Sequence, residues 1–178
     1  MAHLKKPDED EYGAFYAGYV SLVPREEILE VLEDQKIAYM NLVRSFPEAF
    51  RFDAYEPGKW NVAQVCNHIN DSERIFCYRA LALSRGEDKP IPGYDHNAYV
   101  EMVDVRNRTL AGLLAEFDTI REATLSFFRG LPDAYALRAG TVNGYHTSVR
   151  ALAWIMAGHV FHHMQILDQR YGVLRSQG

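Results

Sequence analysis

The sequence has only two cysteines among its 178 residues, Cys66 and Cys77. On the single helix predicted for this region, their spacing corresponds to a rise of about 16 Å, which is too far for a disulfide between them. Two thiols that cannot pair with each other are typical of a reducing compartment. The cysteine content therefore excludes a disulfide-stabilised scaffold, and it predicts a cytoplasmic protein.

The sequence also lacks long apolar runs and an excess of positive charge. No segment approaches the ~20 apolar residues of a membrane span, and the first eleven residues contain no apolar signal-peptide core. The 19 lysines and arginines are outnumbered by 24 aspartates and glutamates, so the formal net charge is −5. Nucleic-acid binders usually carry a basic face. We therefore expect a protein that spans no membrane and binds no nucleic acid.

Four segments carry the helical period of apolar residues, and most are bounded by residues typical of helix ends. Asn61 is a suitable N-cap for the second segment, with Gln64 placed to complete a capping box, and Gly86 is a suitable stop. Residues 130–146 are expected to form a loop or irregular segment, because no strand-like alternation of any length is present. The predicted helices extend from Pro24 to about Ser45, from Asn61 to Gly86, from about Asn97 to Arg129 with a break allowed near 104–107, and from Thr147 to Gly172.

Long helices joined by long connections predict an all-α fold, a four-helix bundle. A chain of this length can bury a sizeable core in one domain, so we expect a single domain over residues 1–178. Residues 1–23 are too rich in aromatic side chains for a disordered tail. They are expected to pack against the bundle as an N-terminal arm.

Three of the seven histidines lie within five consecutive positions, at His159, His162 and His163. His159 and His163 are four residues apart and continue the apolar stripe of their helix, so both should point into the bundle. A pair with this spacing binds a divalent metal in H-E-x-x-H enzymes, but Val160 stands where that motif has its general-base glutamate. The missing glutamate therefore argues against a zincin-type protease. His162 is rotated off the stripe, and we expect it in a supporting or surface position.

His68 is the candidate for a third ligand, because it lies beside the apolar stripe of the second predicted helix. Three imidazoles from two helices leave an open coordination position, as in catalytic zinc sites, where a bound water can reach a pKa near 7. Asp71 and Glu73 follow His68; they are weak candidates for catalytic bases and are expected as solvated or supporting acids. On spacing alone two interpretations stay open, a metal centre and a bundle whose core histidines are satisfied by hydrogen bonds.

Several further side chains are candidates for the surroundings of this site. Tyr94, His96, Tyr145 and Arg150 are candidates for its open side. His146, like His96, flanks a helix start, where it either lines a pocket mouth or belongs to an ordinary loop. Trp60 precedes the second helix and either covers the site or packs against the helix start, and we favour packing.

Two segments resemble the motifs of a known family. In residues 59–73, Trp60 and the polar cap Asn61 precede the helical His68 and its acids, and in residues 157–167 His159 and His163 form a His-x-x-x-His motif. In their order and spacing these segments resemble the DinB-like family, the DinB/YfiT superfamily of metal-dependent enzymes. The resemblance implies a four-helix bundle of up-up-down-down connectivity that often forms a homodimer. It also implies a divalent metal, nickel or zinc before manganese or iron, held by the three histidines His68, His159 and His163.

The function implied by the resemblance is that of a metal-dependent enzyme with a small-molecule substrate. Some relatives are S-transferase-like and add a low-molecular-weight thiol, such as bacillithiol or mycothiol, to an electrophile; the metal binds the thiol as thiolate and lowers its pKa. Two alternatives stay open. One is a metal-dependent hydrolase, and the other is a non-catalytic stress protein that binds a metal or a small molecule. No residue of the sequence identifies a thiol cosubstrate.

Overall fold

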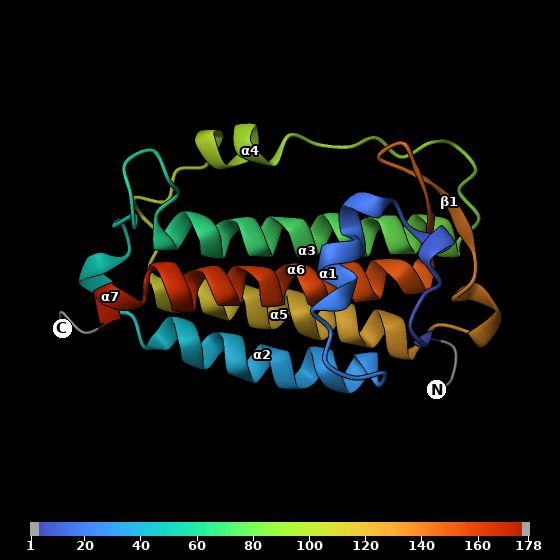
Figure 1. Cartoon of the computed structure of the whole chain (residues 1–178), viewed down its shortest axis with the longest axis horizontal. Coiled ribbons are helices and arrows are strands. Elements are labelled where there is room, and N and C mark those ends of the chain that lie inside the picture. The colour runs from blue at the N-terminus through green and yellow to red at the C-terminus, as the bar shows by residue number, and fades with distance from the viewer. Residues whose placement is uncertain (1–3, 176–178) are drawn as a thin grey trace.

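The computed structural model describes residues 4–175 and shows four long helices packed side by side (Figure 1). The all-α, four-helix-bundle prediction is confirmed, and a small two-stranded sheet lies at one end of the bundle. The first three residues of the predicted N-terminal arm lie outside the described range. The elements are α1 (Ala17–Ser21), α2 (Ile28–Arg44), α3 (Val62–Ser84), α4 (His96–Met102), α5 (Leu110–Arg129), β1 (Ala139–Val142), β2 (Tyr145–Ser148), α6 (Val149–Arg170) and α7 (Gly172–Arg175).

The directions of the long helices follow from their connections. α3 packs against both α5 and α6, and α2 packs against the same two helices from the other side. α2 and α6 run in one direction, and α3 and α5 run in the other (Figure 1). This order differs from the implied up-up-down-down order. The connection over residues 85–109 runs back along the bundle and carries α4, so that α5 begins at the same end as α3, whereas the other two connections turn at the bundle ends.

The ends of α3 are fixed by local sequence. The N–H of Gln64 donates to Oδ1 of Asn61 at 2.8 Å, and the N–H of Asn61 donates to Oε1 of Gln64 at 3.0 Å, which confirms the predicted capping box. At the other end Gly86 has φ +87°, and its N–H donates to the carbonyl of Leu83. This C-terminal motif suits glycine, because other residues are strained at positive φ. The two caps set the register in which α3 presents His68 to α6.

Two predicted helix starts are wrong by one to four residues. α2 begins at Ile28 instead of following Pro24 directly, and the intervening residues form a bend in which Arg25 pairs with Asp34 at 2.6 Å. α6 is capped by Ser148, whose Oγ accepts the N–H of Ala151 at 3.0 Å, and not by Thr147. The hydroxyl of Thr147 instead donates to the carbonyl of Tyr145 at 3.2 Å, and Thr147 pairs with Gly140 in β2.

Two other predicted boundaries changed. The break allowed in the third predicted helix is present, and α4 and α5 are separate helices, the second capped by Thr109. The fourth helix ends at Arg170, and the short α7 follows from Gly172.

The segment predicted to be irregular contains a β-hairpin. β1 and β2 pair antiparallel, and the turn between them is Asn143-Gly144, with φ values of +52° and +81°. Positive φ at both central positions is typical of the type I′ hairpin turn, for which Asn-Gly is a preferred sequence. Ile91 pairs with the hairpin through its N–H to Thr141 and its carbonyl to Asn143, both at 2.9 Å. The hairpin thereby holds the segment that follows α3.

One buried ion pair joins the four long helices. Arg121 of α5 donates from Nε and Nη2 to the carboxylate of Glu73 on α3, at 2.6 and 2.7 Å. Its Nη1 donates to the carbonyl of Leu32 and to Oε1 of Gln35 on α2. Gln35 in turn donates to the carbonyl of Ala157 on α6 at 2.8 Å. Both charges are paired and hydrogen-bonded, which is the condition for burying them.

The N-terminal arm, residues 4–23 as described, crosses α6 and reaches the core. Tyr16 and Val20 are buried in the main hydrophobic cluster. The carboxylate of Glu11 bonds Arg150 and the Ser148 hydroxyl at the start of α6. Where α1 crosses α6 the residue beneath it is Gly158, and a Cβ there would lie 2.0 Å from the carbonyl oxygen of Tyr19. The glycine is therefore what allows the arm to lie this close. Within residues 4–175, no helix combines the length and apolar character needed to cross a lipid bilayer.

Candidate metal centre

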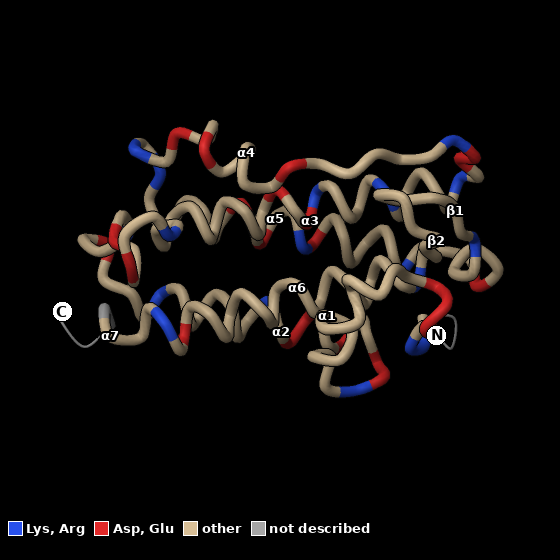
Figure 2. Tube along the Cα trace, turned by 45° about the horizontal axis from the view of Figure 1, so that its top comes forward, with Lys and Arg blue, Asp and Glu red and all other residues tan. Residues whose placement is uncertain are grey.

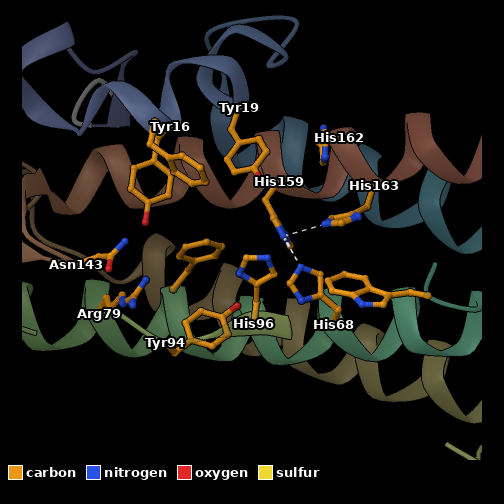
Figure 3. A pocket seen from close by; sticks show the side chains of 13 residues that line it. Tyr16, Tyr19, His68, Arg79, Tyr94, His96, Asn143, His159, His162 and His163 are labelled. Carbon is orange, nitrogen blue, oxygen red and sulfur yellow. Dashed lines mark hydrogen bonds between the residues drawn. The ribbon is translucent and has the colours of Figure 1, made fainter. Parts of the chain in front are cut away.

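The three predicted histidines come together in the interior of the bundle. Nε2 of His68, on α3, lies 3.0 Å from Nε2 of His159 on α6, and Nε2 of His163 lies 3.1 Å from the same atom (Figure 3). One nitrogen from each imidazole falls within 4.8 Å of the other two, and all three residues are buried. The i, i+4 spacing on α6 supplies two of these nitrogens, and the antiparallel packing of α3 against α6 supplies the third.

Hydrogen bonding among the three rings cannot satisfy them. A neutral imidazole nitrogen offers either one N–H or one lone pair, and Nε2 of His159 faces two other Nε2 atoms at once. A divalent ion among three lone pairs satisfies all of them. Two nitrogens at about 2.0–2.1 Å from a tetrahedral zinc lie about 3.3 Å apart, which is close to the two observed separations. The three histidines therefore fit a metal ion.

Burial keeps these histidines neutral, which is the form that binds a metal. Burial, with a smaller contribution from His96 and His162, lowers the pKa of His68 to about 4. Burial also holds the pKa values of His159 and His163 well below the ordinary range, and the neighbouring histidines lower them further. Nδ1 of His163 is buried with no hydrogen-bond partner among the described residues. At neutral pH the three lone pairs are available.

The three histidines line a pocket of about 360 Å³. The N-terminal arm closes one side of it, and the ring of Tyr19 meets the His159 ring edge-on at 5.6 Å between centres. The ring of Phe76 meets His159 at 5.7 Å from another side. The pocket is lined by Phe15, Tyr16, Tyr19, Trp60, His68, Phe76, Arg79, Tyr94, His96, Asn143, His159, His162 and His163.

Trp60 covers the site as well as packing at the start of α3. Its ring centre lies 4.9 Å from that of His68, and its ring stacks on His163 at 6.4 Å with an interplanar angle of 22°. Its carbonyl accepts a hydrogen bond from the hydroxyl of Tyr171. The preference for packing alone was therefore incomplete, because the same indole forms a wall of the pocket.

The candidates for the open side divide into two groups. Tyr94 and His96 line the pocket. Tyr145 and Arg150 are not among its lining residues and instead contact the N-terminal arm. His146 is exposed on β2 and is likewise not among the lining residues.

His162 lies at the pocket edge and is not one of the three converging histidines. It is half-buried, and its ring lies 5.4 Å from that of Tyr19. Its position fits the supporting place expected from helical phase, because the candidate ligand set consists of the other three histidines.

The two acidic candidates point elsewhere. Asp71 is half-buried, and its carboxylate accepts a hydrogen bond from Nδ2 of Asn67 at 2.7 Å; burial raises its pKa. Glu73 is held by Arg121 in the buried ion pair. Neither residue is among those that line the pocket, so we assign neither a part in the chemistry proposed below.

The sequence reasoning missed two polar residues of the pocket, Arg79 and Asn143. Arg79 lies eleven residues after His68 on α3, which is close to three whole turns, so the two share a helix face. That spacing was a usable signal. Asn143 enters the pocket through the hairpin turn, and the Asn143-Gly144 dipeptide was the signal for that turn.

Comparison with known proteins places these features in a family. The DinB superfamily profile matches residues 31–167, which include all three histidines. YfiT from Bacillus subtilis, described as a probable metal-dependent hydrolase with an unusual four-helix bundle topology, superposes with a TM-score of 0.73 at 23% identity, over 84% of this chain and 93% of that one. None of the curated proteins matches the chain. With a match over most of its length, the chain belongs to the DinB superfamily.

Proposed function

We propose that the protein binds one divalent metal ion through Nε2 of His68, His159 and His163 and uses it to activate a thiol against a small electrophile. The observation that carries this proposal is the convergence of three buried imidazole nitrogens on the wall of a pocket. Among residues 4–175, no Cys, Asp or Glu completes the group. Such an arrangement leaves coordination positions for a ligand, as catalytic metal sites do.

A divalent ion held here supplies Lewis acidity, which lowers the pKa of a thiol or water bound to it. Three neutral imidazoles leave the full charge of the ion in place to do so. Nickel or zinc suits an all-imidazole set, and manganese or iron can also occupy it. The residues of the chain provide the rest: Trp60, Phe76 and Tyr19 form apolar walls that exclude water, and the Tyr94 hydroxyl, 2.8 Å from Oγ of Ser72, is held in position.

The absence of a carboxylate from the described pocket lining favours a thiol over water as the nucleophile. No aspartate or glutamate is among the described residues that line the pocket, whereas H-E-x-x-H hydrolases rely on a glutamate to take the proton of water. A thiol needs less assistance, because its ordinary pKa of about 8.5 is already near neutrality. The runner-up is a metal-dependent hydrolase, which is how YfiT is described. A non-catalytic metal-binding role is the third outcome that the experiments separate.

Metal analysis of the purified protein tests the ligand assignment. We expect about one ion per chain, lost in the His159→Ala, His163→Ala double variant. His146→Ala is the matched control, because His146 is exposed and is not among the pocket residues. Metal content unchanged by the double substitution would refute the assignment.

Turnover tests the reaction. Bacillithiol, mycothiol and glutathione are each supplied with 1-chloro-2,4-dinitrobenzene, where transfer forms a sulfur–carbon bond and releases chloride and the thiol proton. We expect consumption of at least one thiol that depends on added metal and is absent in the double variant. Metal-dependent cleavage of an ester or amide panel without thiol consumption would favour the hydrolase. Stoichiometric metal with neither activity would favour the binding role.

A further inference from the structure

Arg79 is a buried cation without a counter-ion. Its side chain is 3% exposed and lines the pocket at the end away from the three histidines (Figure 3). Nη2 donates to the carbonyl of Pro92 at 3.0 Å, and Cζ lies 5.9 Å from the Phe76 ring centre and 5.8 Å from that of Tyr94. Among residues 4–175, no carboxylate lies within 4.0 Å of its guanidinium group.

A cation in this position is costly unless something compensates it. Taking an ion out of water costs several kcal/mol, and buried charges are normally paired. Arg121, the other arginine that is buried within the described residues, shows the usual arrangement, with a carboxylate on two of its nitrogens and two further acceptors. A guanidinium group has five N–H donors, and Arg79 uses one. Arg79 lines the pocket, so an anion there can accept hydrogen bonds from the remaining donors.

The surroundings of Arg79 also select an anion. Acidic and basic residues are interspersed along the chain (Figure 2), and the protein as a whole carries a net charge of −5. The described lining of the pocket nevertheless contains one arginine and no aspartate or glutamate. The Asn143 side chain lies next to Arg79, and the Tyr16 hydroxyl points toward the same end (Figure 3). Both groups can donate a hydrogen bond to an oxyanion.

Asn143 is held at this place by its backbone. Its N–H donates to the carbonyl of Ile91 at 2.9 Å, and its φ of +52° belongs to the hairpin turn. Its side chain lies against Gly93, where a Cβ would be 1.9 Å from Oδ1 of Asn143. The amide is therefore positioned by the hairpin and by the absence of a side chain at Gly93, on the segment whose Pro92 carbonyl holds Arg79.

We infer that Arg79, assisted by Asn143, binds a carboxylate, so that the molecule occupying the pocket is a small carboxylate whose other end reaches the histidines. The second half of this inference rests on the proposed function. A carboxylate fits because its two oxygens match the guanidinium fork. The same chemistry has two sources, since the carboxylate can belong to the electrophile or to the thiol.

The distances limit the size of this molecule. The Phe76 ring centre lies 5.9 Å from Cζ of Arg79 and 5.7 Å from the His159 ring centre, so Cζ and the His159 ring lie within about 12 Å. A bidentate carboxylate places its carbon about 4 Å from Cζ. When that carbon lies on the line toward His159, at most about 8 Å separates it from the His159 ring centre. The pocket volume of about 360 Å³ is at the small end for ligand sites. Aromatic side chains between the two ends favour an apolar or planar body.

Binding to the metal-free full-length protein tests the subsite apart from the metal. The probes are 3-phenylpropionate and its neutral amide, and their binding is measured by calorimetry and by tryptophan fluorescence, because Trp60 lines the pocket. We expect the acid to bind at least tenfold more tightly than the amide. Arg79→Met should remove this preference, Arg79→Lys should keep part of it because lysine retains the charge but not the fork, and Arg85→Met, an exposed arginine on the same helix end, should leave it unchanged.

The thermal stability of Arg79→Met separates a binding role from a purely structural one. If Arg79 serves to bind an anion, replacing this buried cation by an apolar side chain should leave the Tm of the ligand-free protein unchanged or raise it. If Arg79 has only a structural role, the same substitution should lower the Tm. Should Arg79→Met fail to fold, Asn143→Gly carries the test, because glycine keeps the positive φ and removes the amide. Equal affinities for acid and amide, or a preference that survives both Arg79→Met and Asn143→Gly, would overturn the inference.

A second arm identifies the source of the carboxylate. In protein loaded with Co²⁺, 4-mercaptobutyrate and 4-mercaptobutan-1-ol are compared by their sulfur-to-metal charge-transfer bands. If Arg79→Met weakens only the carboxylate thiol, the thiol carries the anion; if it changes neither thiol but abolishes the preference for 3-phenylpropionate, the electrophile does. If the unsubstituted protein does not bind Co²⁺, that result counts against the proposed function. The measurements on the metal-free protein would still show whether Arg79 binds a carboxylate.

Discussion

The close approach of α1 to Gly158 makes one substitution informative about the whole site. In Gly158→Ala the new methyl group would lie 2.0 Å from the carbonyl oxygen, 2.3 Å from the carbonyl carbon and 2.8 Å from the Cα of Tyr19. All three are backbone atoms, so no side-chain rotation relieves the clash. Ordinary contact begins near 3.4 Å, and α1 must therefore move away from α6 by about 1.4 Å. The pocket wall moves with it, because the Tyr19 ring packs on His159.

The expected change in stability is the balance of two opposing effects. Overpacking of this kind costs about 1–3 kcal/mol, while replacing glycine by alanine within a helix contributes about 1 kcal/mol in the other direction. We expect a net loss of up to about 2 kcal/mol in the free energy of unfolding, which lowers the Tm of a chain of this size by up to about 8 °C. The loss should be local, because the four long helices keep the ion pair between Arg121 and Glu73.

Hydrogen exchange and thermal unfolding measure the two parts of this prediction. Amide protection should fall over residues 14–21 and stay unchanged in α3 and α5. The matched control is Gly18→Ala, which makes the same chemical change within α1 where no atom lies within 4 Å of the added Cβ; it should be neutral or stabilise by up to about 1 kcal/mol. If both variants unfold at the same temperature with the same protection of residues 14–21, the glycine is not what allows the arm to pack.

Two further predictions concern charges outside the pocket. Burial raises the pKa of Glu11, but hydrogen bonds from Arg150 and Ser148 outweigh it and hold the pKa at about 2, against an ordinary 4.5. The folded state therefore favours the ionised Glu11 carboxylate, and the stability that this carboxylate contributes is complete above pH 4.5 and is lost as the pH falls toward 2. In urea unfolding, Glu11→Gln should lower the free energy of unfolding by about 1–2 kcal/mol at pH 7 and by less at pH 3. An equal loss at both pH values would contradict this. Arg121→Met leaves Glu73 buried and unpaired, and it should lower the free energy of unfolding by about 3–5 kcal/mol. Most of this loss should be regained in the Arg121→Met, Glu73→Leu double variant. If the losses of the two single variants simply add in the double variant, the pair is not coupled.

Features encoded in a few neighbouring residues were predictable from the sequence. The start of α3 follows from Asn61 and Gln64, and its end from Gly86, because caps depend on residues at most a few positions apart. The pairing of His159 with His163 follows from the helical period alone. Assigning His68 as the third ligand required the further assumption that an inward histidine on a second helix would meet His159 and His163. The packing of α3 on α6 does bring His68 next to His159.

The rest depended on partners far apart in the sequence. Nothing near Glu73 indicates that its counter-ion is Arg121, 48 residues away, so an acid following a histidine was open to a catalytic interpretation. The hairpin had a local signal in Asn143-Gly144, but its strands are four residues each, too short for the alternation to stand out. The covering position of Trp60 depends on where α6 places His163.

Arg79 and Arg121 are both buried on long helices but have opposite surroundings. Arginine is mostly exposed in proteins, so the residue type alone does not indicate that either one is buried. Arg121 meets Glu73 and closes a network among the four helices. Arg79 meets the carbonyl of Pro92, because the connection after α3 runs back along the bundle and is pinned by the hairpin through Ile91. That connection gives Arg79 one acceptor and no charge, and the charge it lacks is the one that a carboxylate in the pocket would bring.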